Sequence, residues 1–139
     1  MKQRSFTIRV QTHGPSLCDV TNEVREFVRN SNIADGLLTC FLRHTSAGLV
    51  IQENADPDVL HDLAAFMNRV VSRDERLYRH TAEGPDDMPS HIRSMLTQTS
   101  LSIPVKQREL LLGMWQAIYL FEHRDKPHTR EIILHLIGE

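Results

Sequence analysis

The sequence predicts an α+β fold with mainly antiparallel strands, in one domain that spans residues 1–139. The length of 139 residues is that of a single domain. Apolar patterns along the chain follow the order strands, helix, strands, two helices, strands. This order lacks the regular alternation of strand and helix that builds a parallel sheet, so antiparallel pairing is favoured.

Seven segments have the short apolar runs or the period-two alternation that is typical of strands. The first shows the pattern clearly, because Phe6, Ile8 and Val10 alternate with polar residues. The seven segments are 5–12, 17–20, 37–43, 48–53, 99–105, 109–121 and 129–137. Gly113 is expected to interrupt the sixth.

Three segments have the apolar spacing of amphipathic helices. The first begins near Thr21, which is expected to be its N-cap. The second begins at Asp56 and Pro57, where aspartate suits the N-cap and proline the first helical position. The third begins at Asp87 or Met88, after a loop-like segment rich in glycine and proline.

Composition narrows the class of protein. The net charge of −2 gives no reason to expect nucleic acid or an anionic membrane as a partner. The N-terminus lacks the apolar core of a signal peptide, and no apolar run approaches the roughly 20 residues of a membrane span. Cys18 and Cys40 lie in apolar strand segments without metal-binding spacing, so both are expected to be free, buried thiols. These features predict a cytoplasmic protein.

The stretch RHTAEGPDDMPSHI, residues 79–92, concentrates titratable side chains in a loop and the start of a helix. Its histidines are His80 and His91, and the carboxylates between them are Glu83, Asp86 and Asp87. Imidazole and carboxylate together suit zinc, manganese or another divalent cation. The spacing matches no common zinc motif, and a purely structural reading, in which an aspartate caps the helix and the histidines bond locally, stays open.

A second stretch, RHTSAGLVIQENAD, follows a predicted strand. His44 ends the strand, and Thr45, Ser46 and Gly48 follow as a small-residue turn whose amides suit an anion. Glu53 and Asp56 lie further on, between a strand and a helix. A plain hairpin followed by an N-cap accounts for the same residues.

A third stretch, GMWQAIYLFEHRDKP, contains a predicted strand and the residues after it. Gln116 and Glu122 share one strand face, and His123 and Arg124 follow at the strand end. The arginine and the carboxylate suit an anionic substrate, or they form an ordinary surface pair.

Taken together, these stretches resemble the YjbQ-like family, known as secondary thiamine-phosphate synthase. The matching segments are HTSAGLVIQENADPDV (44–59), YRHTAEGPDDMPSHIRSML (78–96), SLSIPV (100–105) and LLGMWQAIYLFEHR (111–124). The resemblance implies a compact antiparallel β-sandwich with a helical layer, assembled as a homotrimer. It also implies that histidines from different segments meet in one pocket. Arg108 departs from the family pattern, which usually has glycine there, so a different hairpin turn is expected at this position.

Roles for the matched residues follow from the resemblance and from their chemistry. The expected metal ligands are His44, His80 and His91, with His123 as the substitute. The expected proton-transfer residues are Glu53, Glu83, Asp86 and His123. The expected phosphate-binding residues are Thr45, Ser46, Gln116 and Arg124. The expected cofactor is a divalent metal, zinc first, with manganese or magnesium as alternatives.

The resulting hypothesis is a metal-dependent enzyme that acts on a small phosphorylated substrate. The resemblance implies a weak thiamine-phosphate synthase activity, which joins hydroxymethylpyrimidine pyrophosphate to thiazole phosphate. A metal-dependent hydrolase is the next enzymatic option. The alternative is a non-catalytic trimer that binds a metal and a small anion, and a third hypothesis is a structural protein without a metal.

Overall fold

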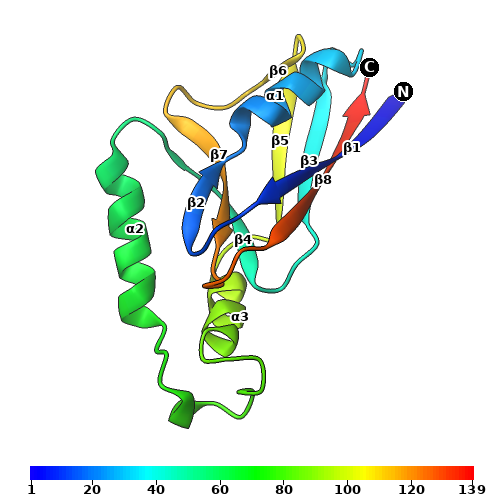
Figure 1. Cartoon of the computed structure of the whole chain (residues 1–139). Coiled ribbons are helices and arrows are strands. Elements are labelled where there is room, and N and C mark those ends of the chain that lie inside the picture. The colour runs from blue at the N-terminus through cyan, green and yellow to red at the C-terminus, as the bar shows by residue number, and fades with distance from the viewer.

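The computed structural model describes residues 1–139 and shows an antiparallel β-sandwich with a helical layer, as predicted (Figure 1). The strands are β1 (Lys2–Gln11), β2 (Ser16–Asp19), β3 (Gly36–Leu42), β4 (Ala47–Glu53), β5 (Ser100–Lys106), β6 (Glu109–Leu110), β7 (Gln116–Glu122) and β8 (Thr129–Gly138). One sheet has the order β1-β8-β3-β5-β6, and the other has the order β2-β7-β4. Every pair of neighbouring strands is antiparallel.

The hydrophobic core lies between the two sheets and the first helix. The period-two alternation of the strands supplies it, because every second residue faces inward. Leu38 and Leu42 of β3, Leu120 of β7 and Leu134 of β8 are completely or almost completely buried in one apolar cluster.

Four helical segments are present: α1 (Thr21–Asn30), α2 (Pro57–Val70), the short 3₁₀ helix η1 (Glu75–Leu77) and α3 (Asp87–Leu96). Asp56 is the N-cap of α2, since its Oδ1 accepts the amide N–H of Asp58 at 2.9 Å. In Figure 1, α2 projects beside the small sheet, and α3 lies at one end of β4.

The expected N-cap of α1 was wrong by one residue, because Val20 holds that position and Thr21 is the first helical residue. The backbone N–H and the hydroxyl of Thr21 both donate to Asp19 Oδ1, at 2.9 and 2.6 Å. The same hydroxyl accepts the N–H of Ile118 at 2.9 Å. Thr21 therefore joins α1 to the middle of β7 instead of capping the helix.

The strand predicted over residues 109–121 is two strands, β6 and β7, separated by residues 111–115. A local turn replaces the ladder: Gln116 Oε1 accepts the N–H of Gly113 at 2.7 Å, and the carbonyl of Gly113 accepts the N–H of Gln116 at 3.0 Å. Trp115 consequently lies outside the strand with an exposed side chain.

The β5–β6 hairpin turn does adopt a positive φ at Arg108, contrary to the expectation from its residue type. Gln107 and Arg108 have φ values of 51° and 64°. Two bonds to the preceding turn hold this conformation: Gln107 N–H donates to Asp35 Oδ1, and Arg108 N–H donates to the carbonyl of Ala34, both at 2.9 Å. Tertiary contacts therefore override the local preference for glycine.

Two smaller expectations concern the cysteines and the membrane. Cys18 and Cys40 are both free thiols; Cys40 is buried and Cys18 is partly buried. None of the helices combines the length and the apolar character that a membrane crossing requires.

Candidate metal centre

Four side chains at the start of α3 converge. His80 and Glu83 precede the helix on a loop, while Asp87 and His91 lie one helical turn apart on it. One ligand atom from each residue lies within 4.8 Å of the ligand atoms of the other three. We call these four residues the histidine–carboxylate cluster. The structure thus brings together two of the three expected metal ligands, His80 and His91.

Asp87 is the centre of this cluster. Its Oδ2 lies 2.6 Å from His80 Nε2 and 3.2 Å from His91 Nε2. Glu83 Oε2 lies 3.8 Å from His80 Nε2. The Asp87 side chain is 2% exposed, whereas those of His80 and Glu83 are 48% and 63% exposed. The cluster therefore has a buried base and a side that is open to solvent.

His91 carries a specific electrostatic conflict. Its Nδ1 lies 3.0 Å from the carbonyl oxygen of Thr45, and because a carbonyl only accepts, Nδ1 must carry the proton. In a neutral ring Nε2 then has a lone pair, and this lone pair faces the carboxylate of Asp87 at 3.2 Å. Two acceptors at this distance are stabilised only by a proton or a metal cation between them. The donor set of two imidazoles and two carboxylates therefore fits a divalent cation.

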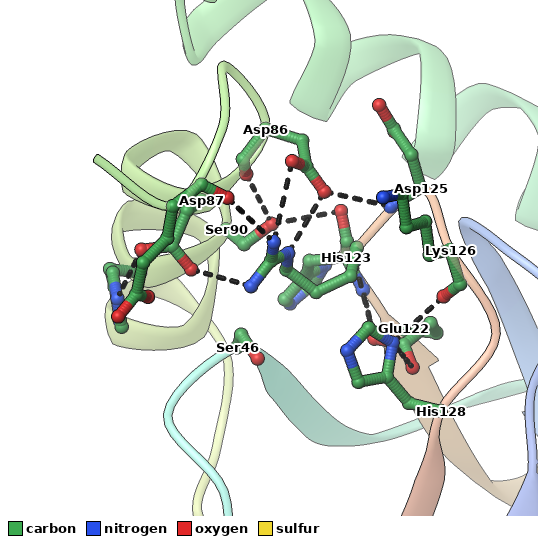
Figure 2. A network of polar contacts seen from close by, with 12 residues as sticks. Ser46, Asp86, Asp87, Ser90, Glu122, His123, Asp125, Lys126 and His128 are labelled. Atoms are coloured by element: carbon green, nitrogen blue, oxygen red, sulfur yellow. Dashed lines mark hydrogen bonds and ion pairs between the residues drawn. The ribbon is translucent and has the colours of Figure 1, made fainter. Parts of the chain in front are cut away.

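Arg124, two residues after the end of β7, holds Asp86 and Asp87 in place; Figure 2 shows the two aspartates. Its Nη1 donates to Asp87 Oδ1 at 2.7 Å, and its Nε donates to Asp86 Oδ2 at 2.9 Å. Its Nη2 donates to the carbonyl of Glu83 at 3.1 Å. Asp86, expected to transfer protons, accepts the amide N–H of Asp125 as well, at 2.9 Å. Arg124 thus positions the cluster, and its donors are already engaged by the protein.

The charges of these groups follow from their surroundings. Burial opposes ionisation of Asp87, but the hydrogen bond from His80 and the charge of Arg124 outweigh it, so the pKa of Asp87 is lowered. Burial also opposes ionisation of Asp86, and the bonds from Arg124 and Asp125 reverse that effect and lower its pKa. The side-chain bond to Asp86 raises the pKa of Arg124. Both aspartates are therefore anionic at neutral pH.

His44 does not join the cluster, although it was expected to bind the metal. Its Nε2 accepts the amide N–H of Glu131 at 2.7 Å, which ties the end of β3 to β8. Burial and the charge of Arg130 lower the pKa of His44, so the ring is a neutral acceptor. The next residue, Thr45, contributes its carbonyl to His91, and phosphate binding by its side chain stays a prediction.

Ser46 and Glu122 belong to a separate buried network around Arg130. Nε and Nη2 of Arg130 donate to Glu122 Oε1 and Oε2 at 2.8 and 2.5 Å. Nη2 also donates to the hydroxyl and the carbonyl of Ser46, at 3.0 and 3.2 Å. Thr12 Oγ1 donates to Glu122 Oε1 at 2.6 Å. Ser46 is therefore occupied within the fold and does not form an open anion site.

Sequence reasoning missed Thr12 and Arg130. A signal for Arg130 was present, since it shares its inward-facing register with Ile132 and Leu134 on β8. A cation among inward-facing apolar residues predicts a buried carboxylate partner.

Glu53 and Gln116 lie at the far end of the small sheet. They face each other in the β4–β7 register, whereas Ala47 faces Glu122 at the end near the cluster. Six residues of strand separate the two ends, a distance of about 20 Å. Glu53 Oε2 accepts the N–H of Asp56 at 3.3 Å, beside the start of α2. Within one chain, neither residue reaches the histidine–carboxylate cluster.

His123, the substitute ligand, is buried, and both of its ring nitrogens lack a hydrogen-bond partner. Burial, together with the charge of Arg93, lowers the pKa of His123 to about 4. Its carbonyl lies 2.9 Å from Ser90 Oγ, so the backbone of His123 docks on α3, as Figure 2 shows. The imidazole itself is not part of the cluster.

The chain is similar to one protein family over nearly its whole length. The model of the family described as UPF0047 protein YjbQ-like matches residues 6–139. A UPF0047 protein of Synechocystis is 51% identical over 99% of this chain and 94% of its own length. UPF0047 protein YjbQ of Escherichia coli O157:H7 is 42% identical over 99% of this chain and 98% of its own length.

Solved structures agree. An uncharacterised protein of the yjbq/upf0047 family from Clostridium acetobutylicum has a TM-score of 0.83 and 31% identity, over 96% of this chain and 99% of that one. A conserved hypothetical protein from Thermus thermophilus has a TM-score of 0.84 and 31% identity, over 95% of this chain and 99% of that one. The fold, the motifs and these matches agree, and the chain belongs to the YjbQ-like UPF0047 family.

Proposed function

We propose that this protein is a metal-dependent enzyme that acts on a small phosphorylated substrate. The cation would be held by His80, Asp87 and His91, with Glu83 beside it and one position open to solvent. The observation that carries the proposal is the pair of acceptors at His91 Nε2 and Asp87 Oδ2, which a bound cation reconciles. Zinc fits two imidazoles and one carboxylate best, manganese also fits, and magnesium fits less well because it prefers oxygen ligands.

The open side of the cluster favours catalysis over a structural metal site. A structural zinc site closes its coordination with protein ligands, while a catalytic site keeps a position for water or substrate. His80 and Glu83 face solvent, so a small molecule has access to the cluster. A bound divalent cation would supply charge neutralisation for phosphate oxygens.

The side chains of the cluster suit distinct tasks. Arg124 donates to Oδ1 of Asp87, which leaves Oδ2 oriented toward both histidines. The carbonyl of Thr45 fixes the ring of His91. Glu83 has only a long contact to His80 and is mostly exposed, so it is free to move a proton to or from a bound substrate.

The finer proposal is a weak thiamine-phosphate synthase activity. In this reaction a ring nitrogen of thiazole phosphate forms a bond to the methylene carbon of hydroxymethylpyrimidine pyrophosphate, and the carbon–oxygen bond to pyrophosphate breaks. The family resemblance and the open, cation-compatible cluster support this choice. A metal-dependent phosphate hydrolase uses the same cluster and is tested beside it.

One observation favours a non-catalytic metal-binding protein, in which the metal alone would hold any small anion. Each of the three side-chain nitrogens of Arg124 donates to an oxygen of Asp86, Asp87 or Glu83. The hydroxyl of Ser46 accepts a hydrogen bond from Arg130. No cationic side chain of the cluster is therefore left for a phosphate. Turnover distinguishes the two functions, because only the enzyme consumes its phosphorylated ligand.

We also propose that the chain forms a homotrimer. The outer face of the five-stranded sheet supports self-association, because Leu37, Phe41 and Ile137 are exposed on neighbouring strands. Light scattering coupled to size-exclusion chromatography measures the mass directly. A monomer at micromolar concentration would contradict the trimer.

Metal content per chain tests the central proposal. We expect about one equivalent of zinc or manganese in tag-free protein, measured by elemental analysis. Replacing His80 and His91 together by alanine should remove it. The matched control is the double replacement of His13 and His61, which are exposed and outside the cluster. Wild-type protein that stays metal-free after incubation with zinc and manganese would refute the proposal.

Activity is then measured on the metal-loaded protein. Thiamine-phosphate formation and phosphate release are followed for wild type and for Glu83→Gln, which keeps the size of the side chain but removes its base. We expect turnover in wild type, a large loss in Glu83→Gln and retained metal in both. Metal binding without any turnover would support the non-catalytic alternative.

A further inference from the structure

Arg93 is a buried cation without an anionic partner. The residue is 6% exposed. Its guanidinium donates one hydrogen bond, from Nη2 to Asn68 Oδ1 at 3.0 Å. Its Nε has no partner, and no carboxylate lies within 4.0 Å of its guanidinium. Arg124 and Arg130, by contrast, are each paired with carboxylates. A buried guanidinium without a counter-ion is unfavourable, which points to a missing anion.

The unpaired imidazole of His123 is next to this guanidinium in the fold. Ser90 and Arg93 lie one turn apart on the same side of α3, and Ser90 Oγ contacts the carbonyl of His123. Both ring nitrogens of His123 lack partners, and the charge of Arg93 contributes to its low pKa of about 4. The neutral ring therefore offers one N–H that no protein group uses.

An apolar pocket of about 290 Å³ lies between α2 and the small sheet, and its lining reaches His123 through the ring of Phe121. Its lining includes Leu63, Phe66, Met67, Thr97 and Phe121. Phe121 contacts the unpaired imidazole, and Met67 and Thr97 are linked to the residues around the unpaired guanidinium. Met67 precedes Asn68, the partner of Arg93; Thr97 Oγ1 donates to the carbonyl of Arg93 at 3.1 Å; and the ring of Phe121 packs against His123 with centroids 4.7 Å apart.

We propose that Arg93 and His123 bind the carboxylate of a small organic acid, whose apolar part occupies the pocket between α2 and the small sheet. The single positive charge of Arg93 matches a monoanion, whereas a phosphate dianion would leave a buried negative charge. The apolar lining matches a hydrocarbon chain or an aromatic ring. The ligand class is therefore an aliphatic or aromatic monocarboxylate.

This site is separate from the histidine–carboxylate cluster. His91 and Arg93 are two residues apart on α3, which places their side chains about 200° apart around the helix axis. His91 faces Asp87 and Thr45, while Arg93 faces Asn68 of α2. The proposal therefore does not depend on metal binding, and it holds whether or not the cluster proves catalytic.

The weak attachment of α2 agrees with a missing ligand. Met67 is its only fully buried residue, and Phe66 and Val70 are half exposed although they belong to the apolar stripe. A hydrocarbon group in the pocket would cover part of Phe66 and join α2 to the small sheet. Binding should therefore raise the thermal midpoint.

Benzoate and hexanoate are the probes, and benzyl alcohol and 1-hexanol are their uncharged counterparts. Binding to the full chain is measured by calorimetry and by the shift in thermal midpoint, with and without added zinc. We expect the carboxylates to bind at least about tenfold more tightly than the alcohols. Arg93→Met should weaken carboxylate binding by about 10- to 100-fold, the effect of losing a bond to a charged group. Arg29→Met is the control, because Arg29 is exposed, is paired with Glu109 and is not part of the pocket lining; it should bind as wild type does.

A second variant tests the same site in case Arg93→Met does not fold. Phe66→Asp replaces a half-exposed residue at the pocket and repels a carboxylate, so it should also abolish binding while the protein stays folded by circular dichroism. Three outcomes would overturn the proposal. These are no carboxylate binding at millimolar concentration, equal binding of acids and alcohols, or binding that both variants retain.

Discussion

Replacing Glu122 with glutamine is expected to lower the free energy of unfolding by about 3–5 kcal/mol, the usual cost of breaking a buried ion pair from one side. Glu122 is completely buried, and its two oxygens accept five hydrogen bonds. Two come from Arg130, one from Thr12, and two from the backbone amides of His123 and Arg124. Glutamine has nearly the same shape, but its NH₂ group would face donors, and Arg130 would lose its counter-ion.

Urea unfolding followed by circular dichroism measures the effect. With a denaturant dependence of about 2 kcal/mol per molar urea, the midpoint should fall by about 2 M. The thermal midpoint should fall by about 10 °C for a chain of this size. Glu109→Gln is the matched control, because Glu109 pairs with Arg29 on the surface, and this variant should unfold as wild type does.

The pH dependence has a defined sign. Burial opposes ionisation of Glu122, but the bonds from Arg130 and Thr12 outweigh it and lower the pKa below its ordinary value of 4.5. The unfolded chain therefore binds this proton first as the pH falls. The stabilisation is fully present above pH 4.5 and is lost as the pH falls through the folded-state pKa. The difference between wild type and Glu122→Gln should accordingly shrink in acid.

A double-mutant cycle separates the pair from its surroundings. Adding Arg130→Met to Glu122→Gln should cost less than the sum of the two single replacements, since the second change removes the unpaired charge left by the first. A loss below about 1 kcal/mol for Glu122→Gln, or strict additivity in the cycle, would refute the reasoning.

Three further predictions concern other parts of the fold. Burial raises the pKa of the Cys40 thiol to about 12, so iodoacetamide at pH 8 should modify the partly buried Cys18 first in the native protein; mass spectrometry showing prior modification of Cys40 would contradict this. Arg108→Gly should raise the free energy of unfolding by about 0.5–1 kcal/mol, because glycine adopts the positive φ without strain; a decrease in urea midpoint would argue against strain at this turn. Gly48→Ala should destabilise by about 1–3 kcal/mol, since the new Cβ would lie 1.8 Å from Thr97 Oγ1 and push α3 from β4; an unchanged midpoint would count against this contact.

The regular elements were predictable because their patterns are local. Alternation along residues 129–137 is visible in the sequence, and the aspartate and proline at the start of α2 specify a helix start. Predictions failed where a distant group decides the outcome. The turn at Arg108 depends on bonds to Ala34 and Asp35, and the role of Thr21 depends on an amide of β7.

In the candidate site, too, local arrangements were predictable and contacts between distant residues were not. His80 and His91 lie in one short segment, so their proximity could be inferred from a loop that leads into a helix. His44 lies at the end of a strand that pairs with β8, and the amide of Glu131 occupies its free nitrogen. The sequence cannot show this, because 87 residues separate the two groups. Arg124 was expected to bind phosphate or to form a surface pair with Glu122, whereas its side chain donates to Asp86 and Asp87, which the sequence did not indicate.

The position of β8 has a consequence for synthesis of the chain. β8 lies between β1 and β3, so it supplies hydrogen bonds to both, yet the ribosome makes it after every other strand of the sheet. Until residues 129–138 emerge, β1 has no partner and the inner edge of β3 is open. The nascent chain therefore exposes two pairing-competent edges, a state in which chains associate with one another or with a chaperone. A C-terminal fusion that slows the pairing of β8 with β1 and β3 should reduce the yield of soluble protein. The reduction should be larger than that caused by the same fusion placed before β1.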